Sequence, residues 1–185
     1  MEVTSLADVL EEQLQDLYNA ENQLIKALPK LAKKASSEGL KKALLEHLEE
    51  TKTQAQRLTS IGETLGIKLT GKKCKAMEGL IEEGEEAIKT DGEASAIDVM
   101  IVAAAQRVEH YEISGYGTAR AIAEQLGYDD VASLLSETLD EESAADEKLS
   151  DICQDELFDE VETDEEEDDS DDDEEESEPE PKSAR

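Results

Sequence analysis

Apolar residues recur every three or four positions over most of the chain, which is the spacing of one face of an α-helix. Alternation of apolar and polar residues, the pattern of β-strands, is nearly absent. Four long segments carry the helical spacing, at residues 6–35, 38–65, 93–126 and 129–154. A shorter amphipathic pattern lies within residues 67–91. The chain is therefore predicted to be all-α.

The lengths of the connections predict how the four long helices are arranged. The first and third connections, at Ser36-Ser37 and at Gly127, are very short, so each joins antiparallel neighbours. The middle connection spans residues 67–91 and can run the length of a helix before the third long helix begins. This order is that of a ferritin-like four-helix bundle with one long crossover that carries a short extra helix.

An internal repeat supports the same arrangement. A shift of 91 residues overlays the first helix pair on the second without gaps in the helices, and it places Leu10 on Ile101 and Leu44 on Leu135. Any two amphipathic helices can align their leucines, but here one offset serves both pairs. The repeat therefore indicates a pseudo-two-fold axis through the bundle.

Acidic residues are spread unevenly along the chain. Of the 50 Asp and Glu residues, 19 lie in 155–185 beside two basic residues, so the net charge of -32 divides into -17 there and -15 in residues 1–154. We expect residues 1–157 to form the bundle and residues 158–185 a disordered acidic tail, because adjacent like charges repel and little apolar area is left to bury. Such a tail serves solubility, collects cations, or binds a basic partner.

Charge and apolar content exclude several classes of protein. Binding to nucleic acid or to an anionic membrane needs a surplus of Lys and Arg, and the chain has 18 of these against 50 acidic residues. No apolar run approaches the ~18–20 residues of a transmembrane helix, and the first residues lack the pattern of a secretory signal. Cys74 and Cys153 form no disulfide framework, so we expect free thiols and a cytoplasmic protein.

Carboxylates interrupt the apolar faces near the middle of the long helices. Glu21 and Glu112 stand at positions that leucine or valine occupies one turn earlier, and the 91-residue shift pairs them. The same shift pairs Glu50 with Glu141. A buried carboxylate is costly unless it is paired or bound to a cation, so these acids indicate a divalent metal site.

Bundles of this kind hold two iron or manganese ions with one Glu from each of two helices and Glu-x-x-His from the other two. This chain departs from that pattern, because His47-x-x-Glu50 reverses the order and Thr138 takes the repeat position of His47. We therefore predict a site for two Fe or Mn ions that is rich in carboxylates and poor in histidine. The preferred ligands are Glu21, His47, Glu50, Glu112 and Glu141, with Glu109, Glu142 and Asp146 as alternates.

Four segments resemble the YciE/YciF ferritin-like family. They are DLYNAE at 16–21, EHLEET at 46–51, EHYEI at 109–113 and TLDEE at 138–142, and the similarity extends over residues 5–153. The resemblance implies a ferritin-like bundle, a homodimer, a di-metal centre and a role linked to stress. The acidic tail lies outside the similarity.

Two hypotheses for function follow. In the first, the chain is a di-iron or di-manganese carboxylate protein that oxidises Fe(II) with O₂ or peroxide, or protects against iron and oxidative stress. In the second, it is a non-catalytic stress-response or scaffold bundle whose core acids are protonated or bridged by water. Added Fe(II) or Mn(II) raises the thermal stability only under the first hypothesis.

The acidic surplus predicts a dependence on salt. A body with a net charge of -15 and few aromatic residues fits adaptation to high salt, where counterions screen the self-repulsion, while the alternative is a cation-collecting role. We predict that the melting temperature rises markedly from low to molar KCl, as followed by circular dichroism. A flat response would favour the cation-collecting role.

Overall fold

The computed structural model describes residues 3–161 of the 185-residue chain. Four long helices are present, α1 (Leu6–Lys34), α2 (Glu38–Leu65), α4 (Ala94–Leu126) and α5 (Asp129–Ile152). The short helix α3 (Lys75–Ala87) lies in the crossover, and a π-helix (Cys153–Leu157) and a 3-10 helix (Phe158–Glu160) follow α5. Residues 3–161 contain no strand. The predicted all-α bundle with one long crossover is confirmed.

Helical structure continues past residue 157, at which we placed the end of the bundle. The acidic tail expected from residue 158 onward falls mainly on residues 162–185, which lie outside the described part of the chain. None of the helices in residues 3–161 combines the length and the apolar content that crossing a membrane requires.

Local signals in the sequence determine where the helices begin and end. Ser5 Oγ accepts a hydrogen bond from the Asp8 N–H at 3.2 Å, and the Asp8 carboxylate accepts one from the Ser5 N–H at 2.8 Å, which caps α1. At the start of α2 a single hydrogen bond forms the cap, because Ser37 Oγ accepts from the Leu40 N–H at 3.1 Å. Gly66 and Gly127, with φ of 68° and 73°, end α2 and α4 in the left-handed conformation that glycine adopts at little cost.

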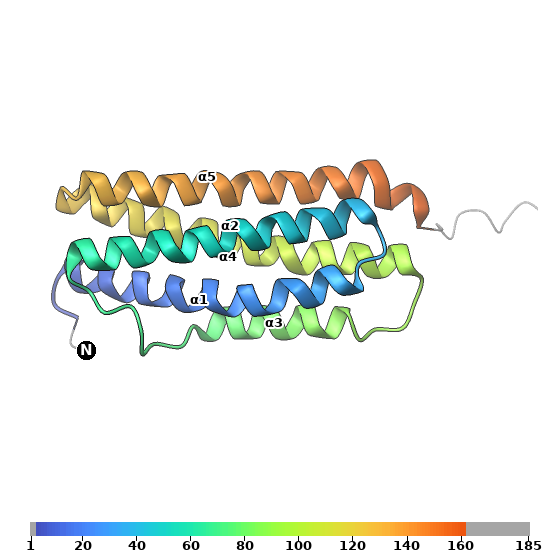
Figure 1. Ribbon diagram of the computed structural model, residues 1–185, viewed down its shortest axis with the longest axis horizontal. Helices are drawn as coiled ribbons and strands as arrows, with labels where there is room; N and C mark the ends of the chain where they lie inside the picture. The colour runs from blue at the N-terminus through green and yellow to red at the C-terminus, as the bar shows by residue number, and fades with distance from the viewer. Residues whose placement is uncertain (1–2, 162–185) are drawn as a thin grey trace, which may run out of the picture.

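The four long helices lie side by side, with α3 along one face of the bundle (Figure 1). α1 packs on α2 and α4 packs on α5, and the crossover brings α1 against α4 and α2 against α5. α3 contacts α1 and α4, so it covers part of the groove between these two helices. The groove between α2 and α5 has no such cover among the described residues.

Side chains of α1 and α4 anchor the start of α3. Asn19 Oδ1 accepts a hydrogen bond from the Cys74 N–H at 2.8 Å, and Gln23 Nε2 donates to the Cys74 carbonyl at 2.9 Å. The Cys74 thiol lies 2.9 Å from the hydroxyl of Tyr111, which donates to the Asp16 carboxylate. Burial raises the pKa of the Cys74 thiol, so this cysteine serves as a neutral structural group.

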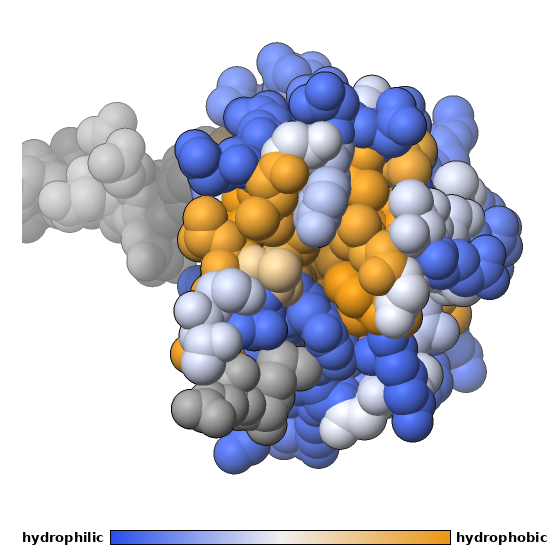
Figure 2. Space-filling view, turned by 90° about the vertical axis from the view of Figure 1, so that its left-hand side faces the viewer, coloured by the Kyte–Doolittle hydropathy of each residue, from blue (hydrophilic) through white to orange (hydrophobic). Residues whose placement is uncertain are grey.

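Apolar side chains close one end of the bundle. Figure 2 views the end at which α2 stops and α5 starts, and hydrophobic residues gather near its centre within a hydrophilic rim. Leu65, Ile67 and Leu126 pack there against the cluster of buried residues beneath them. Access to the interior along the bundle axis is therefore obstructed at this end.

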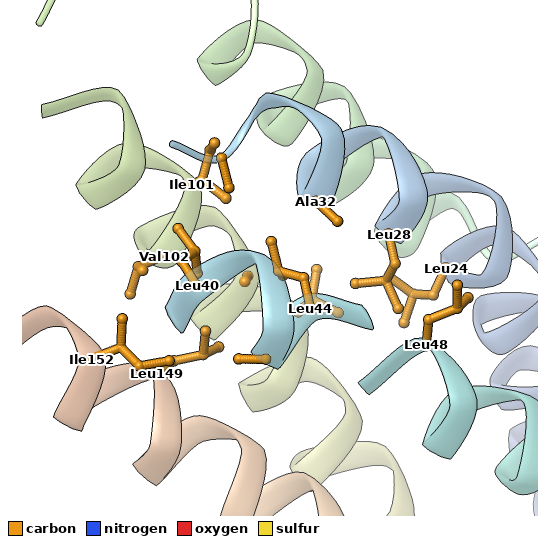
Figure 3. Close-up of a cluster of buried hydrophobic side chains, with 14 of the residues drawn as sticks. Leu24, Leu28, Ala32, Leu40, Leu44, Leu48, Ile101, Val102, Leu149 and Ile152 are labelled. Atoms are coloured by element: carbon orange, nitrogen blue, oxygen red, sulfur yellow. The ribbon is translucent and has the colours of Figure 1, made fainter. Parts of the chain in front are cut away.

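The core consists of two hydrophobic clusters with polar side chains between them. One cluster contains Leu28, Leu44, Ile101 and Leu149 (Figure 3), and the other is built around Leu14, Leu58 and Leu135. Between the two clusters, the four long helices bury a set of side chains that we call the polar layer: Glu21, His47, Thr51, Gln54, Glu109, Glu112, Thr138 and Glu142.

A buried carboxylate outside the polar layer ties the two helix pairs together. Asp98 of α4 is only 1% exposed. It accepts hydrogen bonds from the backbone N–H groups of Ser36 at 3.0 Å and Ser37 at 2.7 Å, and from the Ser36 hydroxyl at 2.6 Å. The connection between α1 and α2 is thereby fixed to α4, a contact that the sequence pattern did not indicate.

We predict that Asp98→Ala lowers the free energy of unfolding by about 3 kcal/mol, because the backbone N–H groups of Ser36 and Ser37 and the Ser36 hydroxyl lose a charged, buried acceptor. Asp91→Ala removes the same charge at an exposed position and is the matched control. Urea unfolding followed by circular dichroism measures both variants. Equal effects in the two variants would contradict the prediction, since only the charge is common to them.

Candidate metal centre

The polar layer gathers titratable side chains from all four long helices. Glu21 comes from α1, His47 from α2, Glu109 and Glu112 from α4, and Glu142 from α5. Glu109 and Glu112 are three residues apart and so share one face of α4. The four carboxylates are at most 1% exposed and His47 is 7% exposed.

Four of these side chains form a compact group of donor atoms. One atom each of His47, Glu109, Glu112 and Glu142 lies within 4.8 Å of the others. His47 Nε2 is 3.4 Å from Glu109 Oε1 and 3.9 Å from Glu142 Oε2. These are ion-pair distances, but neither contact has the geometry of a hydrogen bond. The four side chains therefore lie close together without forming hydrogen bonds to one another through the His47 nitrogens.

Most polar atoms of these side chains are buried without a hydrogen-bond partner. They are both nitrogens of His47, both oxygens of Glu112 and of Glu142, and one oxygen each of Glu21 and Glu109. Each buried unsatisfied atom costs roughly 1–3 kcal/mol, so a set of them at one place needs a compensating ligand. Carboxylate oxygens with an imidazole suit iron, manganese and similar divalent ions, so the residues present fit a metal.

The carboxyl groups of the polar layer hold their protons more tightly than exposed ones. Burial raises the pKa of Glu21, Glu109 and Glu112 well above the usual range, and the charges of neighbouring carboxylates raise it further. Burial also raises the pKa of Glu142, although His47 opposes this shift. In the absence of a cation the layer therefore keeps protons, and a metal that binds there must displace them.

Glu21 lies beside the compact group and is oriented by a tyrosine. The hydroxyl of Tyr116 on α4 is fully buried and donates to Glu21 Oε1. Burial and the charge of Glu21 raise the pKa of Tyr116 well above its usual range, so the hydroxyl remains a donor. The other oxygen of Glu21 has no partner and is free to bind a cation.

Glu141 is engaged by α2 instead of joining the compact group. Arg57 Nη1 and Nη2 each donate to the Glu141 carboxylate at 2.8 Å, and Gln54 Nε2 donates to it at 3.1 Å. Arg57 Nη1 also donates to the Thr138 hydroxyl at 2.6 Å. A two-point contact of this kind holds the carboxylate firmly.

Glu50 and Asp146 also lie at the margin of the group. The Glu50 side chain is 51% exposed, and its Oε2 is 3.5 Å from Nδ1 of His47. Asp146 Oδ1 accepts a hydrogen bond from Gln106 Nε2 at 3.0 Å. Of the eight candidates from the sequence, the structure thus gathers Glu21, His47, Glu109, Glu112 and Glu142 in the core, and it places Glu50, Glu141 and Asp146 around them.

The repeat helps to explain why Glu142 of α5, and not Glu141, is the buried acid. Under the 91-residue shift, Glu142 corresponds to Thr51, and both of these side chains are fully buried, whereas Glu50 and Glu141 point outward. The step from one residue to the next turns by about 100° around a helix axis. The sequence signal for this was Thr51, a residue without charge beside Glu50, which could have marked the inward position on α2 and its repeat equivalent Glu142 on α5.

A four-helix bundle with one long crossover and a buried layer of carboxylates is the architecture of a ferritin-like protein. Residues 5–162 match a family described as a domain of unknown function, DUF892, and the chain belongs to this family. It is 48% identical over 153 residues to Protein YciF of Escherichia coli K12, a match that covers 82% of this chain and 92% of that protein. The predicted resemblance to YciF is confirmed.

Solved structures show the same fold. The crystal structure of the E. coli stress protein YciF matches with a TM-score of 0.80 at 47% identity, over 82% of this chain and 96% of that chain. YcfI of Rhodopseudomonas palustris, described as a structural protein, gives 0.78 at 44% identity over 80% and 95% of the two chains. A Xanthomonas campestris protein gives 0.64 at 22% identity, covering 81% of this chain and 92% of that chain, and shows the fold alone.

The raised pKa values predict that the metal-free protein is more stable in mild acid. A carboxyl whose pKa is raised by folding gives its full stability below the unfolded value of 4.5 and loses it as the pH rises through the folded value. We therefore expect the free energy of unfolding in the presence of a chelator to fall from pH 5 toward pH 8.

Glu112→Gln should weaken this pH dependence and stabilise the metal-free protein at neutral pH by about 1 kcal/mol or more, because the amide is neutral without taking up a proton on folding. Glu49→Gln makes the same change on an exposed residue and should leave the slope as in the wild type. Urea unfolding at several pH values compares the three proteins. Identical slopes in all three would show that the polar layer does not control the pH dependence.

Proposed function

We propose that this chain is a metal-binding ferritin-like protein that holds two iron or manganese ions in the polar layer. The observation that carries the proposal is the convergence of buried donor atoms without partners from all four long helices. The proposed ligands are His47, Glu109, Glu112 and Glu142, which come from α2, α4 and α5, together with Glu21 from α1.

Charge favours two ions over one. Four carboxylates lie in the layer, and once ionised they carry four negative charges in a region of low dielectric. Two divalent cations neutralise them, whereas a single ion leaves an excess of negative charge. The repeat relation between Glu21 and Glu112 gives each half of the bundle an acid for such a pair of ions.

The chemistry that bound iron supplies in such a site is the oxidation of Fe(II) by O₂ or peroxide, because hard carboxylates stabilise Fe(III). The residues of this chain contribute orientation and exclusion of water. Tyr116 orients Glu21, and one hydrophobic cluster covers the polar layer on each side along the bundle axis. E. coli YciF is called a stress protein, and removal of redox-active metal would be a stress role of this kind.

A second function is favoured by a different observation. The raised pKa values allow the buried carboxyls to remain protonated, and YcfI is described as a structural protein. In this alternative the chain is a non-catalytic bundle, and the polar layer specifies how the helices align. Such a protein gains no stability from added metal.

Metal binding is tested directly by elemental analysis and thermal melting. We predict about two iron or manganese ions per chain after reconstitution, and a rise in melting temperature with added Mn(II), because a ligand that binds only the folded state stabilises it. Glu112→Ala should lose both effects and should also slow the oxidation of added Fe(II). Glu49→Gln should behave as the wild type. If the protein binds less than one metal ion per chain, and added metal changes neither the melting temperature nor the rate of Fe(II) oxidation, the metal-binding function is refuted and the non-catalytic bundle remains.

A further inference from the structure

A pocket between α2 and α5 leads from the surface to the candidate metal centre. It has a volume of about 310 Å³, large enough for a divalent ion with its inner shell of water. His47 and Glu109 of the polar layer line it, as do Glu50 and Lys148, whose side chains are about half exposed. The pocket therefore connects solvent with two members of the buried group.

Small side chains on both helices keep this pocket open. Ala43 of α2 and Ala144 and Ala145 of α5 form its sides, at positions where a longer side chain would project into the space. The other side of Glu109 is different, because α3 covers it and leaves a void of only about 20 Å³. Among residues 3–161, the groove between α2 and α5 thus gives the wider approach to Glu109.

The polar groups of the pocket suit a cation better than an anion. Lys148 is paired with Glu46 at 2.5 Å, and Glu141 is paired with Arg57, so these charges are largely compensated. Glu50 at the mouth and Glu109 inside remain as acidic groups without a Lys or Arg partner, and Glu109 gives up its proton when a cation binds.

His47 connects the mouth of the pocket to its interior. Its Nδ1 is 3.5 Å from Glu50 Oε2, and its Nε2 is 3.4 Å from Glu109 Oε1. Both nitrogens, and Oε2 of Glu109, are buried without a hydrogen-bond partner although these residues line the pocket. A cation that reaches Glu50 is therefore one side chain away from the buried carboxylates.

We propose that the α2–α5 pocket is the entrance through which a hydrated divalent cation reaches the polar layer. Glu50 is the first carboxylate that the ion meets, and His47 passes it on to Glu109. This inference rests on the proposed metal function and adds a route to it. Because a route affects entry and exit equally, narrowing it changes both rate constants and leaves the dissociation constant unchanged.

Ala144→Leu tests the route by filling the pocket from its exposed rim, with Ser143→Leu as the control that adds the same side chain one residue away, outside the pocket. Stopped-flow absorbance follows the binding of Co²⁺ to the metal-free full-length protein. We expect Ala144→Leu to bind about tenfold more slowly, since a filled gap between packed helices opens only by local motion. Its dissociation constant and final amplitude should equal those of the wild type, and Ser143→Leu should bind at the wild-type rate.

Glu50→Gln tests the mouth independently of packing, and Glu49→Gln changes the global charge by the same amount at a residue outside the pocket. We expect Glu50→Gln to slow binding about threefold at low ionic strength and less in molar salt, because local attraction of the ion is screened. Glu49→Gln should not slow it.

Two results would contradict the proposal that the α2–α5 pocket is the entrance. One is a wild-type binding rate in both Ala144→Leu and Glu50→Gln. The other is a loss of equilibrium affinity in Ala144→Leu that matches its loss of rate, because this would place the pocket in the binding site instead of on the route. A wild-type protein that binds no Co²⁺ at all would refute the proposed metal function itself, which keeps the two failures distinguishable.

Discussion

The burial of four carboxylates and one imidazole across the middle of the bundle is the constraint on which the rest of the structure depends. Ionised carboxylates in a core are stable only with a compensating positive charge, and protonated ones only at the pKa shifts found here. The polar layer divides the apolar core into two clusters, and each cluster must hold its own half of the helices in register. The layer therefore lies between the two halves of the apolar core and contains the candidate site.

The surroundings of the layer are arranged to hold the acids apart from solvent while leaving their inner oxygens free. Tyr116 takes one oxygen of Glu21 and leaves the other without a partner, and at the margin of the layer Arg57 holds both oxygens of Glu141. α3 covers the groove between α1 and α4, and the opposite groove is left with the 310 Å³ pocket. A bundle that only needed stability would gain from filling that pocket with apolar side chains. Its alanines are more consistent with passage to the layer.

The internal repeat accounts for the scaffold but not for the composition of the site. The pair Glu21 and Glu112 obeys the 91-residue shift, whereas Glu109 corresponds to Tyr18, and Glu142 corresponds to Thr51. The second half of the chain thus contributes three acids to the polar layer. The first half contributes one acid and the only histidine of the layer. This asymmetry distinguishes the two helix pairs chemically, although their apolar positions still match.

The sequence by itself determined the all-α class, the helix limits to within a few residues and the crossover, because apolar spacing, capping residues and connection lengths act locally along the chain. It also indicated that Glu21 and Glu112 interrupt an apolar face. It did not settle which of Glu141 and Glu142 faces inward, because the 91-residue shift favoured Glu141 as the partner of Glu50 while the apolar spacing of the helix left both residues possible. The tertiary structure decided this, since Arg57 comes from another helix and pairs with Glu141. The pocket between α2 and α5 likewise exists only once two distant helices pack, because a void is a property of the gap between surfaces and not of either sequence.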